Sequence, residues 1–376
     1  MLCAAFAAVT ALTSTLLPHR AWGAIAWIGY TAGAALVLVL SRRLVVWLVF
    51  AATALLPLLV ESIQRASGRT DRAQEEVLVV EHMGDRLVHT GTPYLSRAAI
   101  ADLPADDRLL GYAPYQPGMS VFGLPRAAFG SSWWTDARVW FAIVTLFCLV
   151  YSLKLLLADA HRLTQAVAAL PLCTLTLATG GDDIPVLALC VLALALASRD
   201  RFIAAGVAVG LAGALKLFAL PVALVLLVLA WPPLSRAARF AVFAFGIPLV
   251  ALVPALVVHP DAFMENAIRF PTGQGLVTSP AQSPLPGHLI ASSLPAGRTI
   301  ALALLLLAGA VIAYLLYRHR PTTSAAAAAF IAAGLTAAIM LTPTTRFGYL
   351  LYPATFLAYW WDQRRSDSHV NEPRQV

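Results

Sequence analysis

A cluster of acidic residues follows the third long apolar run and offers the first candidates for chemistry. Its members are Asp71, Glu75, Glu76, Glu81 and Asp85. A carboxylate held at a membrane surface beside low-dielectric protein can act as a general base, because burial raises its pKa toward the working pH. The alternative is that these acids are solvated loop charges. The pattern predicts that at least one of them is functional.

Lys216 is the second candidate, because it is the only cation within the apolar stretch 202–231. An ionisable side chain at membrane depth costs about 2.5–3.5 kcal/mol on insertion scales and commonly marks function. A lysine there suits the binding of a phosphate as a point charge. The alternative is a lysine whose ammonium snorkels to the membrane interface.

Further polar residues lie in short turns between apolar runs. Asp182 and Asp183 follow two glycines and could bind sugar hydroxyls or a metal, although Asp182 could equally cap a helix that Pro185 begins. Arg346 could fork onto a phosphate or anchor the chain at the interface. Tyr349 could be a ligand or an aromatic-belt residue. The sequence contains no Walker A loop, dinucleotide glycine motif or zinc spacing, which argues against a nucleotide bound in a Rossmann-type domain.

The elements that position these residues are apolar helices. Of the 376 residues, 60% are hydrophobic and 12% are charged, and the mean hydropathy is +0.77. A soluble domain carries about 25% charged residues, so the composition predicts an all-α membrane protein. The net charge of +7 comes from short basic clusters between the apolar runs, which indicates anchoring at an anionic leaflet and not nucleic-acid binding.

About twelve apolar runs predict transmembrane helices, although several of them are shorter than the roughly 20 residues that a straight span needs. They form one membrane domain, 1–361, followed by a cytoplasmic polar tail, 362–376. The positive-inside rule places both termini in the cytoplasm and two long loops, 62–137 and 259–298, outside. The predicted spans are 2–17, 22–40, 44–61, 138–157, 163–179, 184–198, 202–217, 219–231, 238–258, 299–317, 324–342 and 347–361.

The number of helices in the stretch 202–231 decides whether all the basic clusters can lie on the cytoplasmic side. One long tilted helix would put Arg236 and Arg239 outside, whereas two short helices with Lys216 at the outer turn keep both arginines inside. Gly206, Gly210 and Gly213 have the spacing of a helix that packs closely against a neighbour. We therefore predict two helices that meet at Lys216.

These motifs together resemble glycosyltransferase family 87, whose members are polyprenol-phosphate-sugar-dependent enzymes of the GT-C fold and include actinobacterial mannosyltransferases. The resemblance covers roughly residues 70 to 355. Two positions depart from the family: Glu76 stands where Asp is common, and Asp182-Asp183 where a Gln/Asn turn is commoner. The segments that carry it are Glu76 to Val80 with Gly91-Thr92-Pro93-Tyr94, Tyr112-Ala113-Pro114-Tyr115 with Gly123-Leu124-Pro125, Gly180 to Asp183, the glycine-bearing helix Ala205 to Lys216, and Arg346 to Pro353.

The resemblance implies an inverting transfer of a hexose, mannose in the first instance, or of a pentose. The donor would be a polyprenyl-phosphate sugar and the acceptor an extracytoplasmic glycolipid or glycan. Glu76 would act as base, with Glu81 and then Asp85 in reserve. Lys216 and Arg346 would hold the phosphate. Substrate contacts would extend to Asp182, Asp183, Tyr349 and Tyr115.

The resemblance also implies a multi-pass protein of the bacterial plasma membrane that works on its outer side. No residue pattern indicates a metal or another cofactor. A transporter or flippase for a lipid-linked or small polar substrate is the alternative function, since it would need the same intramembrane charges. It would also need polar residues that line a path to both faces, whereas the candidate residues fall on the predicted outer side.

Overall fold

The computed structural model describes residues 1–156 and 170–370, and within these residues the secondary structure is helical, with one isolated β-bridge between Gln282 and Thr345. The all-α prediction is confirmed. The helices of eight or more residues are α1 (Leu2–Thr13), α2 (Leu17–Leu36), α3 (Arg42–Phe50), α4 (Leu56–Ala66), α5 (Glu75–Thr90), α9 (Ala137–Leu155), α11 (Pro171–Thr179), α12 (Asp183–Ala197), α13 (Phe202–Leu215), α14 (Ala219–Ala230), α15 (Leu234–Val258), α17 (Pro286–Ser293), α18 (Gly297–Arg318), α19 (Ser324–Leu341) and α20 (Leu351–Val370).

Five helical stretches among the described residues are long and apolar enough to cross a membrane: Arg42–Ala66, Ala137–Leu155, Leu234–Val258, Gly297–Arg318 and Ser324–Leu341. The first of them joins α3 to α4 through a π-helical turn, Ala51–Leu55. Shorter apolar helices are α1, α12, α13 and α14. The count of about twelve spans stays a prediction, and the predicted span 163–179 lies partly outside the described residues.

The chain breaks at Lys216. Helix α13 ends at Leu215, Lys216 has an extended backbone, and α14 begins at Ala219. The prediction of two helices in this stretch is therefore confirmed, and the single long helix is not formed. Pro221 lies in the first turn of α14, where its missing N–H has no intrahelical acceptor in any case.

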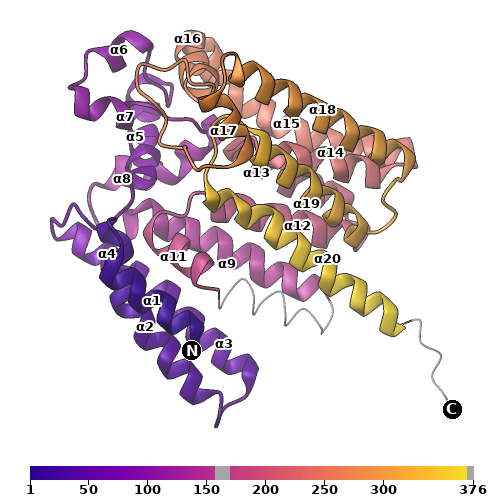
Figure 1. Ribbon diagram of the computed structural model, residues 1–376, viewed down its shortest axis with the longest axis horizontal. Coiled ribbons are helices and arrows are strands. Elements are labelled where there is room, and N and C mark those ends of the chain that lie inside the picture. Colours follow the sequence, from indigo (N-terminus) through magenta and orange to yellow (C-terminus); the bar gives the residue numbers. More distant parts are fainter. Residues whose placement is uncertain (157–169, 371–376) are drawn as a thin grey trace. The chain divides into compact units, whose positions relative to one another are not determined.

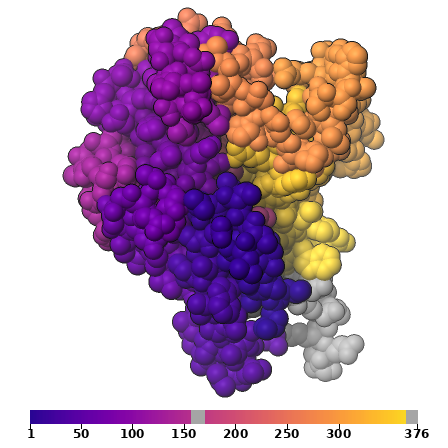
Figure 2. All heavy atoms as spheres, turned by 60° about the vertical axis from the view of Figure 1, so that its left-hand side comes forward, coloured from indigo at the N-terminus to yellow at the C-terminus, as the bar shows by residue number. Residues whose placement is uncertain are grey.

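The described residues fall into two compact units. The first comprises 1–93, 119–150 and 170–188, and the second comprises 94–118, 151–156 and 189–370. In the first unit α1 and α2 pack as a hairpin (Figure 1), and Figure 2 shows this hairpin on the surface as one continuous indigo region. The Trp22 indole donates to Thr53 O at 2.7 Å, and Tyr30 hydrogen-bonds Thr174 at 2.9 Å, which ties α2 to its neighbours.

In the second unit the closest helix pair is α13 with α15. A Cβ atom at Gly206 would lie 2.6 Å from the Phe240 carbonyl oxygen, and Gly210 and Gly213 face Phe243 and Pro248 in the same way. Small residues on one helix face let two backbones approach this closely. The predicted packing role of the three glycines is confirmed, and this packing holds α13, the helix that ends one residue before Lys216.

Short helices fill the chain between the long ones. Between α4 and α9 lie α5, α6 (Arg97–Ala101), α7 (Arg108–Gly111) and α8 (Leu124–Phe129), and between α15 and α18 lie α16 (Pro260–Met264) and α17. Within the second unit, Tyr112 stacks on Phe270 with ring centroids 4.1 Å apart, and both pack on buried Ile100. This small core joins residues 94–118 to residues 260–277.

Candidate active site

A network of five buried charges lies at the centre of the first unit. Arg138 and Glu61 have no exposed side-chain surface, and Asp136 has 1%. Arg138 forms two parallel bonds to Asp136, Nε to Oδ1 at 2.9 Å and Nη2 to Oδ2 at 2.8 Å, and lies 3.4 Å from Glu61. Arg65 forms ion pairs with two carboxylates, with Asp136 at 3.0 Å and with Glu81 at 2.6 Å. Each buried charge therefore has an opposite partner, which burial in low dielectric requires.

Arg138 also binds two turns of the backbone. Its Nη1 atom donates to Arg72 O at 2.6 Å and to Ala178 O at 2.9 Å. The same two segments are also joined to each other, because Gln74 N–H donates to Thr179 O at 2.9 Å. One guanidinium thus holds the start of α5 against the turn that precedes α12.

Glu76, the first candidate base, lies in the first turn of α5 and is half-buried. The neighbouring Gln74 amide nitrogen hydrogen-bonds His19 Nε2. With the amide nitrogen as the donor, His19 Nε2 is the acceptor. Burial lowers the pKa of His19, and the nearby Glu76 carboxylate offsets part of that shift. A histidine that the sequence analysis did not single out therefore lies beside the candidate base.

Asp182 and Asp183 belong to the turn that Arg138 holds. Gly181 has φ +77°, a left-handed conformation that glycine adopts without strain, and α12 begins directly after Asp182. Asp182 is 4% exposed and Asp183 is half-buried. Gly180 has no room for a Cβ atom because the Gln74 side chain lies against it. The structure thus brings Gln74, the residue before α5 and two residues before Glu76, into contact with the turn that leads to Asp182, more than a hundred residues later in the sequence.

The two reserve bases are in different surroundings. Glu81 is 5% exposed. Its carboxylate forms ion pairs with Arg65 and, at 3.2 Å, with Arg126, and it accepts a hydrogen bond from the Ala137 N–H at 3.2 Å. A carboxylate that accepts from two guanidinium groups serves as an anchor. Asp85 is exposed and pairs with His89 one helical turn away at 3.3 Å.

Lys216 lies in the second unit and is 8% exposed. Its ammonium nitrogen is 4.9 Å from the centroid of the Tyr115 ring, within cation–π range. The segment that carries this tyrosine docks on the end of α13, because Gln116 N–H donates to Leu215 O at 3.1 Å. Tyr94 OH donates to Tyr115 O at 2.7 Å. The geometry therefore couples two predicted binding residues, Lys216 and Tyr115.

Two further residues hold the Tyr115 segment in place. Glu265 is fully buried and accepts from Tyr112 OH at 2.8 Å and from Arg97 at 2.9 Å. Asn266 accepts from Ala113 N–H at 2.8 Å and donates to Leu95 O at 2.8 Å. Both polar side chains have their hydrogen bonds within the second unit, so they position the segment and hold it rigid.

Aromatic rings extend the surroundings of Lys216 toward Arg346. Phe218 lies two residues after Lys216, and its ring is 4.9 Å from Tyr349 and 5.0 Å from Tyr352, on which it stacks. Tyr349 N–H donates to Arg346 O at 3.1 Å, and Arg346 is half-buried. The predicted residues Arg346 and Tyr349 thus belong to the same aromatic neighbourhood as Lys216.

Several residues escaped the sequence analysis although the sequence carried a signal for them. Glu61 and Arg65 are ionisable residues at the end of an apolar run, and ionisable side chains at membrane depth commonly mark function. Asp136 and Arg138 stand at the start of another. The sequence therefore showed four of the charged residues of this network, but it did not show which of them are in contact. Nothing in the sequence singled out His19 or Glu265.

Asp136 shows how strong this network is. Burial alone would raise the pKa of its carboxyl, but the charges and hydrogen bonds of Arg138 and Arg65 outweigh burial and hold that pKa well below its usual range. Among the described residues, no group of three or more His, Cys, Asp or Glu side chains could hold a metal ion. The carboxylates of this network, Glu61, Glu81 and Asp136, are instead paired with arginines.

Comparison with known proteins identifies the family to which the chain belongs. The family model of glycosyltransferase family 87 matches residues 112–343, well over half of the chain. The matched range includes Tyr115, Asp182, Asp183 and Lys216, whereas Glu76 and Arg346 lie outside it. No curated protein and no solved structure matches the chain.

We expect Arg138→Met to destabilise the protein by about 3–5 kcal/mol, because it leaves Asp136 and Glu61 buried without their partner. Thermal unfolding of the purified protein in mild detergent measures the change. Arg126→Met is the matched control, since Arg126 is 22% exposed and Glu81 keeps Arg65 without it. Equal unfolding temperatures for the two variants would contradict the central role of Arg138.

We expect stability to fall as the pH drops below about 6.5, partly because of His19. The folded state lowers the pKa of His19 from 6.5, so the unfolded chain binds the proton first and acid favours unfolding. His82, whose pKa burial also lowers, acts in the same direction. His19→Gln keeps an acceptor for Gln74 and should flatten the pH dependence of the unfolding temperature between pH 5 and 7. An unchanged slope in this variant would show that His19 is not neutral in the folded state.

Proposed function

Because the chain belongs to glycosyltransferase family 87, we propose that this membrane glycosyltransferase uses a polyprenyl-phosphate sugar as donor. The sugar is a hexose, with mannose the first candidate, or a pentose, and the acceptor is an extracytoplasmic glycolipid or glycan. The observation that supports this donor is Lys216, a nearly buried cation at a break between two apolar helices. An ionisable side chain at membrane depth commonly marks function, and a lipid-borne phosphate would reach this one from the membrane.

The length of α13 supports this assignment. Its 14 residues rise about 21 Å, less than the roughly 30 Å of the hydrocarbon core. Arg201 stands at its N-terminal end, and Lys216 follows its C-terminal end. With Arg201 at the cytoplasmic surface, as the positive-inside rule asks, Lys216 would lie in the outer half of the membrane, roughly 9 Å short of the outer edge of the hydrocarbon core.

In the proposed reaction Lys216 holds the donor phosphate and stabilises the charge that develops on it as leaving group. Arg346 is a second phosphate ligand. Tyr115 and Tyr349 contact substrate, and Asp182 and Asp183 bind sugar or acceptor hydroxyls. Glu76 takes the proton of the acceptor hydroxyl, whose oxygen attacks the anomeric carbon from the face opposite the phosphate. The C–O bond to phosphate breaks, and the configuration inverts.

We expect Glu76→Gln to abolish sugar transfer while leaving the amount of folded protein unchanged. The amide keeps the shape of the side chain but takes no proton. Glu75→Gln is the matched control, because Glu75 is the exposed neighbour in the same helical turn. Transfer of labelled mannose from polyprenyl-phosphate mannose measures both. Near-normal turnover in Glu76→Gln would rule out Glu76 as the base.

We expect Lys216→Met to weaken donor binding about 10- to 150-fold, since a hydrogen bond to a charged group contributes about 1.5–3 kcal/mol. Methionine keeps the apolar stem, so a snorkelling anchor would tolerate the change. Lys216→Arg restores the charge with a different geometry and should rescue binding in part. Lys154→Met, at the other lysine of the chain, is the control. Equal donor affinity in all four proteins would show that Lys216 holds no phosphate.

A further inference from the structure

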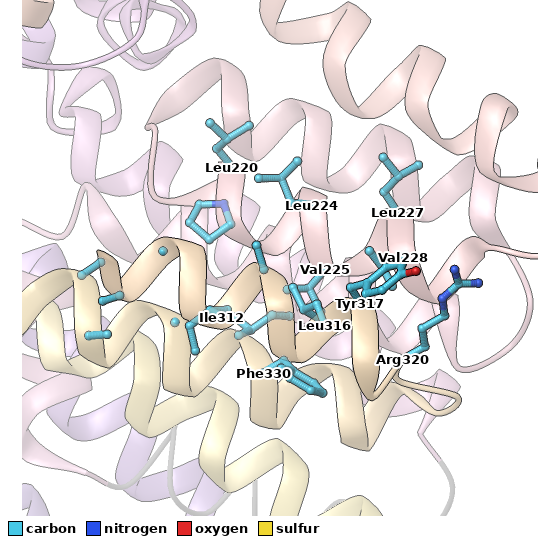
Figure 3. Close-up of a pocket in the computed structure, with 18 of the residues that line it drawn as sticks. Leu220, Leu224, Val225, Leu227, Val228, Ile312, Leu316, Tyr317, Arg320 and Phe330 are labelled. Carbon is cyan, nitrogen blue, oxygen red and sulfur yellow. The ribbon is translucent and has the colours of Figure 1, made fainter. Parts of the chain in front are cut away.

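A groove of about 760 Å³ runs along the second unit between α14, α18 and α19. Apolar side chains line most of it, among them Leu220 and Leu224 of α14, Leu316 of α18 and Phe330 of α19 (Figure 3). Three of the helix pairs around it, α14 with α19, α18 with α19 and α14 with α13, are in contact, so the groove is bounded by packed helices.

The groove is polar at one end. Figure 3 shows Tyr317 and Arg320 at the end opposite Leu220. Trp231 also lines the groove, and Trp231 and Tyr317 are 45% and 71% exposed. Among the described residues that line the groove, Arg320 carries the only charge. Tryptophan, tyrosine and arginine together are typical of the level at which hydrocarbon meets headgroups.

The basic turns of the second unit lie at this same end. Arg236 follows Trp231, donates to Pro232 O at 2.7 Å and pairs with Asp200 at 3.4 Å. The turn 199–201 therefore lies beside the Trp231 end of α14. The positive-inside rule assigns such turns to the cytoplasmic leaflet, whose anionic lipids attract basic residues by about 1 kcal/mol each.

The length of the groove matches one leaflet. Helix α14 supplies one wall along its 12 residues, which rise about 18 Å. Half of the roughly 30 Å hydrocarbon core is about 15 Å. A chain that enters at Arg320 and ends near Leu220 is thus the length of one acyl chain.

We propose that this groove binds an anionic phospholipid of the cytoplasmic leaflet, with one acyl chain along α14 and its phosphate on Arg320. The position of Arg320 sets the orientation of the lipid, with its phosphate at the Arg320 end of the groove. Lys216, at the opposite end of α14, is not among the residues that line the groove. This site is separate from the proposed donor phosphate site and does not depend on the proposed function. The lipid fills the space between three helices and stabilises their arrangement.

The test uses the full chain in nanodiscs that contain equal amounts of phosphatidylglycerol and phosphatidylcholine. Native mass spectrometry of the released protein counts the bound lipids and identifies them. We expect wild type to retain one phosphatidylglycerol in preference to phosphatidylcholine. Arg320→Gln should reduce that preference about fivefold, the equivalent of about 1 kcal/mol. Arg318→Gln, on the same helix end but outside the lining, should leave it unchanged.

A second variant tests the acyl-chain position. A Cβ atom at Gly309 meets nothing within 4 Å, so Gly309→Leu fits sterically and fills the groove. It should remove the bound lipid, whereas Gly246→Leu, at an equally open glycine outside the groove, should retain it. The proposal is overturned if wild type shows no preference for phosphatidylglycerol or if either groove variant keeps it. A polyprenyl phosphate that Gly309→Leu displaces would also overturn it, in favour of the donor as occupant.

Discussion

A guanidinium without exposed surface is destabilising by several kcal/mol unless its charge is paired and its donors are hydrogen-bonded, and Arg138 has four such partners. Two are carboxylates, Asp136 and Glu61, and two are backbone carbonyl groups, at Arg72 and Ala178. The carbonyl groups belong to turns far apart in the sequence. The geometry of the candidate base and of the Asp182 turn therefore depends on a charge that itself has no place in the proposed chemistry.

The second unit uses the same principle with different residues. Glu265 is buried, and its partners Arg97 and Tyr112 come from a segment more than 150 residues away. The result is a fixed segment that presents Tyr115 to Lys216 at 4.9 Å. In both units a buried ionic group fixes the backbone of a segment next to a candidate site residue. This arrangement is suited to a site in which the reacting groups must be held in place before the substrate arrives.

The sequence predicted the helices well, because apolar runs and breaks are local properties: the break at Lys216 and the glycine face of α13 were both readable. It predicted the candidate residues as separate motifs. That Glu76 shares its surroundings with Asp182 and His19 depends on contacts between distant segments, which no local pattern encodes. Glu81 illustrates the limit, since it lies in the same acidic cluster of the sequence as Glu76, and only the structure shows that two arginines pair with its carboxylate. The lipid groove likewise arises only when α14, α18 and α19 come together.

The central claim is that the protein cleaves the bond between sugar and lipid phosphate. Phosphorus-31 NMR of proteoliposomes that contain polyprenyl-phosphate mannose and a glycolipid acceptor tests this directly, because the donor is a phosphodiester and the released lipid is a phosphomonoester. A transferase converts the diester signal to the monoester signal in proportion to the sugar gained by the acceptor. A transporter or flippase would move the donor with its diester signal intact, and that result would contradict the account.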